Sequence, residues 1–360
     1  VPSLETSRGE GWSTSTGSPL LLTGNTLLFL LLGPGDAVAR LLPALAGTAL
    51  VALPWLWRRR LGDLGALCAA GLLMFSPIAL FGARHLDATV IGTLGAALVI
   101  TALSTVQRRP DLLLAFGLAL GLTGGPSFYD VLLPGLAAWA LANKLFDETH
   151  APDRHTLVRG LLMGLGGALL ISVGFGLRWS GWAGPAEGFA AWMQSWWSPV
   201  PKGLLNLAHL LLYEPATLLL VIVGLVFGTR NPRRLPVEMG TWAVLSAVLM
   251  LLRPGADPAT LLVVIVPLAL LAGRTVVALA FKPVWQTYLH AALTVLFWIF
   301  AALVLTRQTS YLQNGLEFML VLLVLLIQGL LTVGFATMVG GDQGWRGLLI
   351  GTAVCLLIIQ

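Results

Sequence analysis

Apolar stretches of similar length recur along the chain from Asp36 to Gln360, and charged residues are largely confined to the gaps between them. Each stretch is near the ~20 residues that a helix needs to cross ~30 Å of hydrocarbon. The pattern predicts about 12 transmembrane helices. The predicted spans are residues 37–57, 64–82, 88–106, 111–124, 128–145, 158–178, 204–227, 237–252, 259–281, 288–306, 316–338 and 346–360.

The composition indicates that lipid is the solvent of these stretches. Apolar residues make up 57% of the chain and charged residues 10%, which is incompatible with a surface exposed to water. In lipid every backbone N–H and C=O must be paired, and the stretches are longer than the ~10 alternating residues of a barrel strand. We therefore predict an all-α, polytopic integral membrane protein.

Lys and Arg residues are distributed unevenly between alternate loops, and this asymmetry predicts the orientation. Of the 21 Lys and Arg residues, 13 fall in one set of loops and six in the other. The rich set, expected to face the cytoplasm, comprises Arg58, Arg59, Arg60, Arg108, Arg109, Lys144, Arg154, Arg159, Arg230, Arg233, Arg234, Lys282 and Arg346. The poor set, expected on the outer side, comprises Arg8, Arg84, Arg178, Lys202, Arg253 and Arg307.

Residues 1–35 are expected on the outer side, ahead of a single transmembrane domain formed by residues 36–360. Within the first segment, Pro19–Leu32 is apolar but short and is interrupted by polar residues. We interpret it as a helix that lies at the outer interface rather than as a span. Because the chain begins at Val1 without a methionine, a leading segment is expected upstream.

Five sequence patterns between Ser18 and Gly273 indicate a family resemblance. They are SPLLLTGNTLLFLLLGPGDAVARLLPALAG and its continuation, LLMFSPIALFGARHLDATVIG, AFGLALGLTGGPSFYDVLLP, HLLLYEPATLLLVIVGLV and RPGADPATLLVVIVPLALLAG. In their order and spacing the chain resembles the membrane-embedded GT-C glycosyltransferases that use lipid-phosphate sugar donors, the group of protein O-mannosyltransferases and aminoarabinose transferases. The last two patterns are similar to a bacterial and archaeal branch associated with polyprenyl-linked glycan assembly. The resemblance implies a GT-C-like bundle in a bacterial or archaeal cytoplasmic membrane.

The chain departs from this family at positions that carry chemistry. Family members place an acidic pair in the first outer loop, where a carboxylate takes the proton of the acceptor hydroxyl. Glu5 and Glu10 are isolated here, and the pair would lie upstream of Val1. The lysine that follows Thr123 in the family, suited to a donor phosphate, is Gly124 in this chain. The resemblance therefore implies a GT-C scaffold with degenerate catalytic motifs.

Asp87 and Arg84 are the remaining candidate catalytic residues, in the outer loop after the second predicted span. A carboxylate at the mouth of a span can position an acceptor or a metal, and an arginine can meet a phosphate. The alternative is a charged pair that anchors a helix end in the headgroup region, with Asp87 at a helix N-terminus. We interpret the pair as the remnant of a site.

Five tryptophans in one outer loop are the candidate contacts with lipid or a partner. They are Trp179, Trp182, Trp192, Trp196 and Trp197. Trp favours the membrane interface because its ring is apolar while its N–H reaches water. One interpretation is a lid or groove for a lipid tail or sugar. We favour an amphipathic interfacial helix that anchors the loop or docks a neighbouring subunit.

Tyr213 and Glu214 are further candidates, because they interrupt the apolar stretch 204–227. An unpartnered carboxylate in lipid costs several kcal/mol, so Glu214 is expected to have a partner on another helix or to border a water-filled cavity. A functional cavity and a structural hydrogen bond both remain open. No histidine stands at metal-ligand spacing and no phosphate loop is found, so neither a metal nor a cofactor is expected. The basic residues form short clusters at span ends, which argues against nucleic acid.

Two functions follow from these observations. The first is a non-catalytic GT-C-like protein that serves as a structural or accessory subunit of a larger membrane complex, with respiratory and photosynthetic complexes as candidate hosts. Membrane lipids and other membrane subunits are then its expected partners. The alternative is an active glycosyltransferase that uses a polyprenyl-phosphate sugar at the outer face. A transporter is a more distant hypothesis, because clear discontinuous helices and buried charge pairs are not evident from the sequence.

Overall fold

The computed structural model describes residues 18–146, 152–176, 179–197, 203–228, 234–253, 258–280, 285–308 and 315–359 of the 360-residue chain. All regular structure in these ranges is helical. The prediction of an all-α protein is therefore confirmed.

The first part of the chain forms α1 (Pro19–Leu32), α2 (Asp36–Ala39), α3 (Leu41–Ala52), the 3₁₀ helix η2 (Leu53–Trp57), α4 (Arg58–Leu61), α5 (Asp63–Phe75), α6 (Pro77–Arg84), α7 (Thr89–Ser104), α8 (Pro110–Thr123), α9 (Ser127–Leu145) and α10 (Arg154–Ser172). The second part forms η3 (Gly174–Gly176), η4 (Trp179–Ala183), α11 (Gly184–Gln194), η5 (Ser195–Trp197), α12 (Gly203–Tyr213), α13 (Pro215–Gly228), α14 (Arg234–Leu252), η6 (Pro258–Leu261), α15 (Leu262–Ala280), α16 (Trp285–Gln308) and α17 (Gly315–Ile359).

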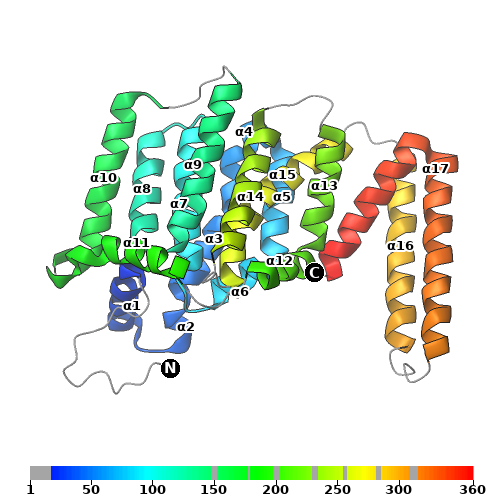
Figure 1. The fold of residues 1–360 in the computed structure, drawn as a ribbon, viewed down its shortest axis with the longest axis horizontal. Helices are drawn as coiled ribbons and strands as arrows, with labels where there is room; N and C mark the ends of the chain where they lie inside the picture. Colours follow the sequence, from blue (N-terminus) through cyan, green and yellow to red (C-terminus); the bar gives the residue numbers. More distant parts are fainter. Residues whose placement is uncertain are drawn as a thin grey trace.

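The long helices stand side by side, so the bundle has two distinct ends (Figure 1). We call the end that carries α4, the C-terminal ends of α7 and α9 and the N-terminal ends of α10 and α14 the basic end. At the opposite end, α11 and α12 lie across the bundle, and α1, α2 and α6 are found there too (Figure 1). The predicted cytoplasmic loops that the structure describes therefore meet at one end.

Burial separates the central helix from the peripheral ones. In an 18-residue apolar segment within Ala259–Leu279, which includes α15, 78% of the residues are buried. In the corresponding segment of Arg154–Ser172, which forms α10, only 22% are buried. A helix that is apolar on all faces packs at the centre of a bundle or faces lipid. Here α15 packs at the centre, and α10 presents exposed apolar residues at the periphery.

Small residues allow neighbouring helices to approach closely. A Cβ atom on Gly95 of α7 would lie 2.5 Å from the backbone nitrogen of Gly121 in α8. On the other side of α8, a Cβ atom on Gly164 of α10 would lie 2.7 Å from Leu118 Cβ. Without a hydrophobic driving force between helices in lipid, such close contacts supply the packing energy.

Two of the predicted spans are broken, each at the residue before a proline. Residues 64–82 form α5 and α6, which are bent by 60° at Ser76, and residues 204–227 form α12 and α13, which are bent by 89° at Glu214. Proline lacks a backbone N–H and disfavours the helical conformation of the residue before it. The second stretch was predicted as one crossing, but α12 lies across the opposite end (Figure 1).

Four helical stretches in the described residues are long and apolar enough to cross a membrane. They are Leu41–Leu61, Arg154–Ser172, Arg234–Leu252 and Ala259–Leu279. The number rises to six if each bent pair is one span. The chain is an integral membrane protein by these criteria, and the total of about 12 spans stays a prediction.

Helix α1 is attached at the opposite end. The Ser18 hydroxyl donates a hydrogen bond to the Thr123 carbonyl (2.9 Å), and the Thr23 hydroxyl donates to the Ile171 carbonyl (2.9 Å). These two contacts join α1 to the last turns of α8 and α10. Its placement at a lipid interface stays a prediction.

The C-terminal helix α17 is bent at Gly341, which has a φ of +50°. It contains both predicted spans 316–338 and 346–360. The second half packs on α16, where a Cβ atom on Gly347 would lie 2.5 Å from the Thr287 carbonyl oxygen. The bend requires glycine because a positive φ is costly for other residues.

Candidate functional site

Asp87 forms hydrogen bonds with residues at the start of α7. Its carboxylate accepts hydrogen bonds from the Ala88 backbone N–H (2.6 Å) and from the Thr89 hydroxyl. Arg84 is exposed at the end of α6, and no ion pair joins it to Asp87 in the part of the chain that is described. The geometry therefore favours the anchoring interpretation of Asp87, although both residues lie at the same end.

Glu214 lies at the point where the two broken spans meet. Its side chain is completely buried, and it accepts hydrogen bonds from the hydroxyls of Ser76 and Thr217, the latter at 3.1 Å. Ser76 also accepts a hydrogen bond from Ala79 N (3.1 Å) at the start of α6. The expected partner on another helix is thus Ser76.

The electrostatics of this junction follow from the helix ends. Glu214 directly precedes α13 and Ser76 directly precedes α6, so the N-termini of two helices converge near one carboxylate. Each N-terminus carries a partial positive charge that favours a negative group. The arrangement stabilises the buried acid and joins the two breaks.

Trp192 connects the tryptophan segment to a buried ion pair. Its indole Nε1 donates to Asp130 Oδ1 (2.7 Å), and Asp130 Oδ2 lies 2.9 Å from Arg253 Nη1. Asp130 and Arg253 are 2% and 3% exposed, so the pair is shielded from solvent. Sequence analysis missed this pair; the signal for it was a lone Asp early in one apolar stretch and a lone Arg at the end of another.

The five tryptophans differ in burial: Trp192 is buried, Trp196 is half-buried and the other three are exposed. The Trp192 ring is tilted against Tyr129, stacked on Phe189 and edge-on to Trp196, with ring centroids 5.7–5.9 Å apart. The exposed members are Trp179, Trp182 and Trp197, at 69%, 54% and 74%. Part of the predicted contact surface therefore serves to hold α11 on the bundle.

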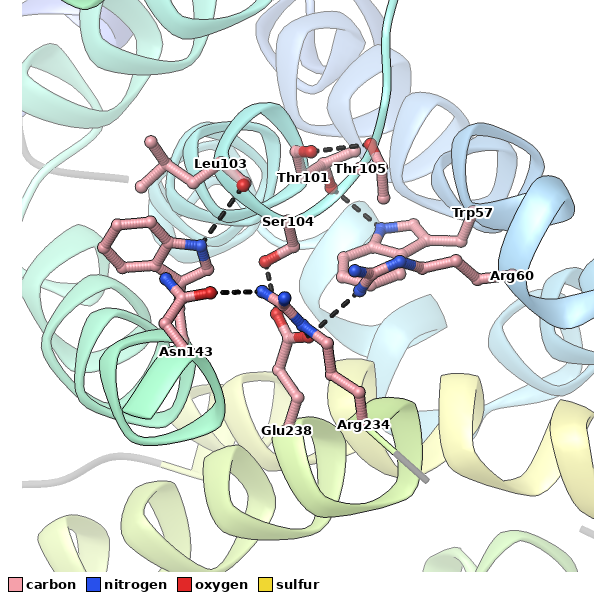
Figure 2. A network of polar contacts seen from close by, with 10 residues as sticks. Trp57, Arg60, Thr101, Leu103, Ser104, Thr105, Asn143, Arg234 and Glu238 are labelled. Carbon is pink, nitrogen blue, oxygen red and sulfur yellow. Dashed lines mark hydrogen bonds and ion pairs between the residues drawn. The ribbon is translucent and has the colours of Figure 1, made fainter. Parts of the chain in front are cut away.

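A second polar network occupies the basic end (Figure 2). Glu238 is 1% exposed, and its Oε2 atom lies 3.0 Å from Arg60 Nη1 and 3.8 Å from Arg234 Nε. Its Oε1 atom accepts a hydrogen bond from the Ser104 hydroxyl. Arg234 also donates to the Asn143 side-chain oxygen. The network joins α4, α7, α9 and α14, and sequence analysis missed Glu238 because it stands at the edge of a predicted span.

Two tryptophans flank the basic-end network, as Figure 2 shows for Trp57. Trp57 Nε1 donates to the Thr101 hydroxyl (2.9 Å), and Trp139 Nε1 donates to the Leu103 carbonyl (3.2 Å). Both bonds satisfy indole groups that burial would otherwise leave unpaired. The basic end is therefore fixed by side-chain hydrogen bonds as well as by apolar packing.

No known protein-family model matches the sequence, and no curated protein matches it. Solved structures do resemble it. The crystal structure of ArnT from Cupriavidus metallidurans bound to undecaprenyl phosphate superposes with a TM-score of 0.57 and 17% sequence identity over 95% of this chain. The apo structure of ArnT gives a TM-score of 0.54, also at 17% identity and 95% coverage.

The chain has a GT-C-like fold. The predicted resemblance is thereby confirmed at the level of the fold. This chain covers 66% of the undecaprenyl-phosphate-bound ArnT chain and 65% of the apo chain, so it spans about two thirds of their length. In the described residues of this GT-C-like protein, no group of three His, Cys, Asp or Glu side chains is placed to hold a metal ion.

Gly124 stands in the GT-C-like fold where the family resemblance implies a lysine. It follows α8 and packs against α7, so that a Cβ atom on Gly124 would lie 2.7 Å from the Gly92 backbone nitrogen and 2.9 Å from Gly92 Cα. Backbone atoms at these distances cannot move aside as a flexible side chain would. A side chain of any size at this position therefore collides with α7.

Proposed function

We propose that the protein is a non-catalytic GT-C-like subunit that supports a larger membrane assembly. The observation that carries the proposal is the contact of Gly124 with Gly92, because it leaves no space for the lysine that the family resemblance implies next to a donor phosphate. The helices have closed on each other at a position where the chemistry needs a long cationic side chain. The packing of Gly124 against α7 thus occupies the position from which a lysine would contact the phosphate.

Three carboxylates at the opposite end support the same proposal. Asp130 is paired with Arg253, Glu214 accepts from Ser76, and Asp87 accepts from groups at the start of α7. A general base must be able to reach the proton of an incoming acceptor. These three carboxylates are instead engaged by the protein, and two of them are buried.

Exposed aromatic and apolar side chains supply a surface for partners. Trp179 and Trp182 stack on each other with centroids 6.1 Å apart, and both are exposed. Aromatic residues are enriched where proteins dock and where they meet the membrane interface. We place this surface on the outer side of a bacterial or archaeal cytoplasmic membrane, in contact with lipids and with other subunits. Respiratory and photosynthetic complexes are the candidate hosts.

Two measurements on the full-length protein test the proposal. Purification from its native membrane in a mild detergent is expected to recover a constant set of other membrane subunits at fixed stoichiometry. The purified protein, given a polyprenyl-phosphate sugar and candidate acceptors, is expected to transfer no sugar. A solitary protein that transfers sugar contradicts the proposal.

The alternative function is an active glycosyltransferase at the outer face. The observation that favours it is the fold, which is similar to that of ArnT in a complex with undecaprenyl phosphate. A polyprenyl-phosphate sugar would then be the donor, with Asp87 and Arg84 orienting the donor or the acceptor. An acidic pair in the sequence upstream of Val1, together with a loss of transfer activity on Asp87→Asn, would support this function over the first.

A further inference from the structure

The structure joins two basic turns through contacts that span 47 and 51 positions of the sequence. The Gln107 side-chain nitrogen donates to the Leu56 carbonyl (3.1 Å), and Arg59 Nη1 donates to the Val106 carbonyl (3.3 Å). These bonds fix the segment between α7 and α8 against η2 and α4. One surface at the basic end therefore carries four exposed arginines, which we call the arginine patch: Arg58, Arg59, Arg108 and Arg109.

In the described part of the chain, two acids near the arginine patch form ion pairs with arginines outside it. Arg60 and Arg234 both lie near the same carboxylate, Glu238, so this buried acid is already engaged by two guanidinium groups. Asp111 on the neighbouring helix is engaged with Arg159 at 3.6 Å. Asp63 is the exposed acid that follows α4 in the chain. Among the described residues of these two turns and the helix starts that follow them, the four exposed arginines therefore outnumber the exposed carboxylate of Asp63.

Exposed apolar side chains lie among these arginines. The Arg58 guanidinium stands 4.9 Å from the centre of the Trp55 ring, and that residue is 44% exposed. Val106 is 57% exposed between the two basic turns, and Leu112 is 47% exposed after the second. Trp residues with one apolar face mark the level of the lipid headgroups in membrane proteins. Cationic and apolar side chains are therefore exposed next to each other at the basic end.

We propose that the arginine patch binds the headgroup of an anionic phospholipid, whose acyl chains lie along Trp55, Val106 and Leu112. Arginine donates two parallel hydrogen bonds to a phosphate, and basic clusters at a membrane surface attract anionic lipids. The adjacent exposed apolar residues favour an amphipathic ligand over a free phosphate or an acidic protein segment. The pairing of Arg60 with Glu238 holds α4 in place, so that the guanidinium groups of the patch are positioned before the lipid arrives.

The test is a binding titration with the purified full-length protein in neutral detergent, using fluorescent phosphatidylglycerol as the probe. Each basic group near a membrane surface contributes roughly 1 kcal/mol, so Arg58→Gln with Arg59→Gln is expected to weaken binding about thirtyfold. Arg108→Gln with Arg109→Gln is expected to have a similar effect, because the site spans both turns. Arg58→Lys with Arg59→Lys retains the charge and is expected to lose much less affinity.

The matched control is Lys144→Gln with Arg154→Gln, which removes two exposed charges from the same end on α9 and α10. We expect it to change the affinity less than about threefold. An equal loss in the control would show that only the general charge of this end matters and would overturn the site. The inference also fails if phosphatidylcholine binds as tightly, if glycerol phosphate competes as well as the lipid, or if an acidic peptide binds more tightly than phosphatidylglycerol.

Discussion

Ser76 and Glu214 are separated by 138 positions in the sequence, yet their side chains are hydrogen-bonded where two broken helices meet. Both residues precede a proline, and both are completely buried. A helix break leaves backbone groups without partners, which is costly away from water. The Ser76 hydroxyl accepts a hydrogen bond from the Ala79 N–H at one break, and its own hydrogen bond to Glu214 links the start of α6 to the junction of α12 and α13.

Substitution of Glu214 tests the energetic role of this junction. Glu214→Ala would leave the hydroxyls of Ser76 and Thr217 without their acceptor, and we expect a loss of roughly 1–3 kcal/mol in unfolding free energy. Glu214→Gln keeps an acceptor oxygen and is expected to lose less. The measurement is unfolding of the purified protein in detergent by titration with a denaturing detergent. The exposed Asp36→Ala is the control, and equal losses in both variants would argue against a special role for the junction.

The Asp130–Arg253 pair gives a second prediction. Asp130→Asn is expected to destabilise the protein by about 3–5 kcal/mol, because it leaves the Arg253 guanidinium buried without a counter-ion. The double replacement Asp130→Leu with Arg253→Met is expected to recover most of that loss, since an apolar pair has no desolvation cost. A double-mutant cycle on unfolding free energies, with Asp130→Leu and Arg253→Met as the single variants, measures the coupling. If the double variant is as unstable as the sum of the single variants, the pairing energy is absent.

The contact between Gly124 and Gly92 predicts a strong penalty for a single methyl group. We expect Gly124→Ala to lower the unfolding free energy by about 1–3 kcal/mol through overpacking against α7. Gly166 of α10 is the matched control, because among the described residues no heavy atom lies within 4 Å of a Cβ atom built on it. Gly166→Ala is expected to be neutral or stabilising, since alanine favours the helix by about 1 kcal/mol over glycine. Equal thermal stability of the two variants would mean that α7 and α8 can move apart.

The exposed and the buried tryptophans of this segment are expected to affect different properties: assembly with partner subunits and stability of the isolated protein. Trp179→Ala with Trp182→Ala changes exposed side chains, so unfolding of the isolated protein is expected to shift by less than about 0.5 kcal/mol. Recovery of partner subunits in mild detergent is expected to fall. Trp192→Phe is instead expected to lower the unfolding free energy, because it removes the hydrogen bond to Asp130. Unchanged subunit recovery with the exposed pair removed would contradict a docking role for this surface.

Much of the fold could be predicted from the sequence because hydropathy is a local property. The stretches that became α3, α10, α14 and α15 are apolar over a helix length, and each of them is helical in the structure. The stretch at residues 204–227 was apolar enough to be predicted as a single crossing, and the break at Glu214 was not recognised as a bend of 89°. A proline alone does not determine whether a membrane helix kinks slightly or turns across the bundle, because that depends on the groups that receive its exposed end.

The candidate site was predicted less completely than the fold. Glu214 was expected to need a partner, and Ser76 proved to be one, but Asp130 and Glu238 were not singled out at all. Their importance comes from arginines on other helices, and nothing within either apolar stretch identifies those partners. The family resemblance drew attention to Gly124, while the packing that closes this position against α7 was visible only in the structure.

The sequence by itself determined that this protein is helical and membrane-embedded, because both properties depend on the length and polarity of continuous stretches. The tertiary structure decided which polar groups meet. It brought Ser76 to Glu214, and Asp130 to Arg253. It also brought the basic turn at Arg59 to the one that follows Val106. The reason is that contacts between helices depend on how small residues let their backbones approach, and that geometry is a property of helix pairs rather than of either segment alone.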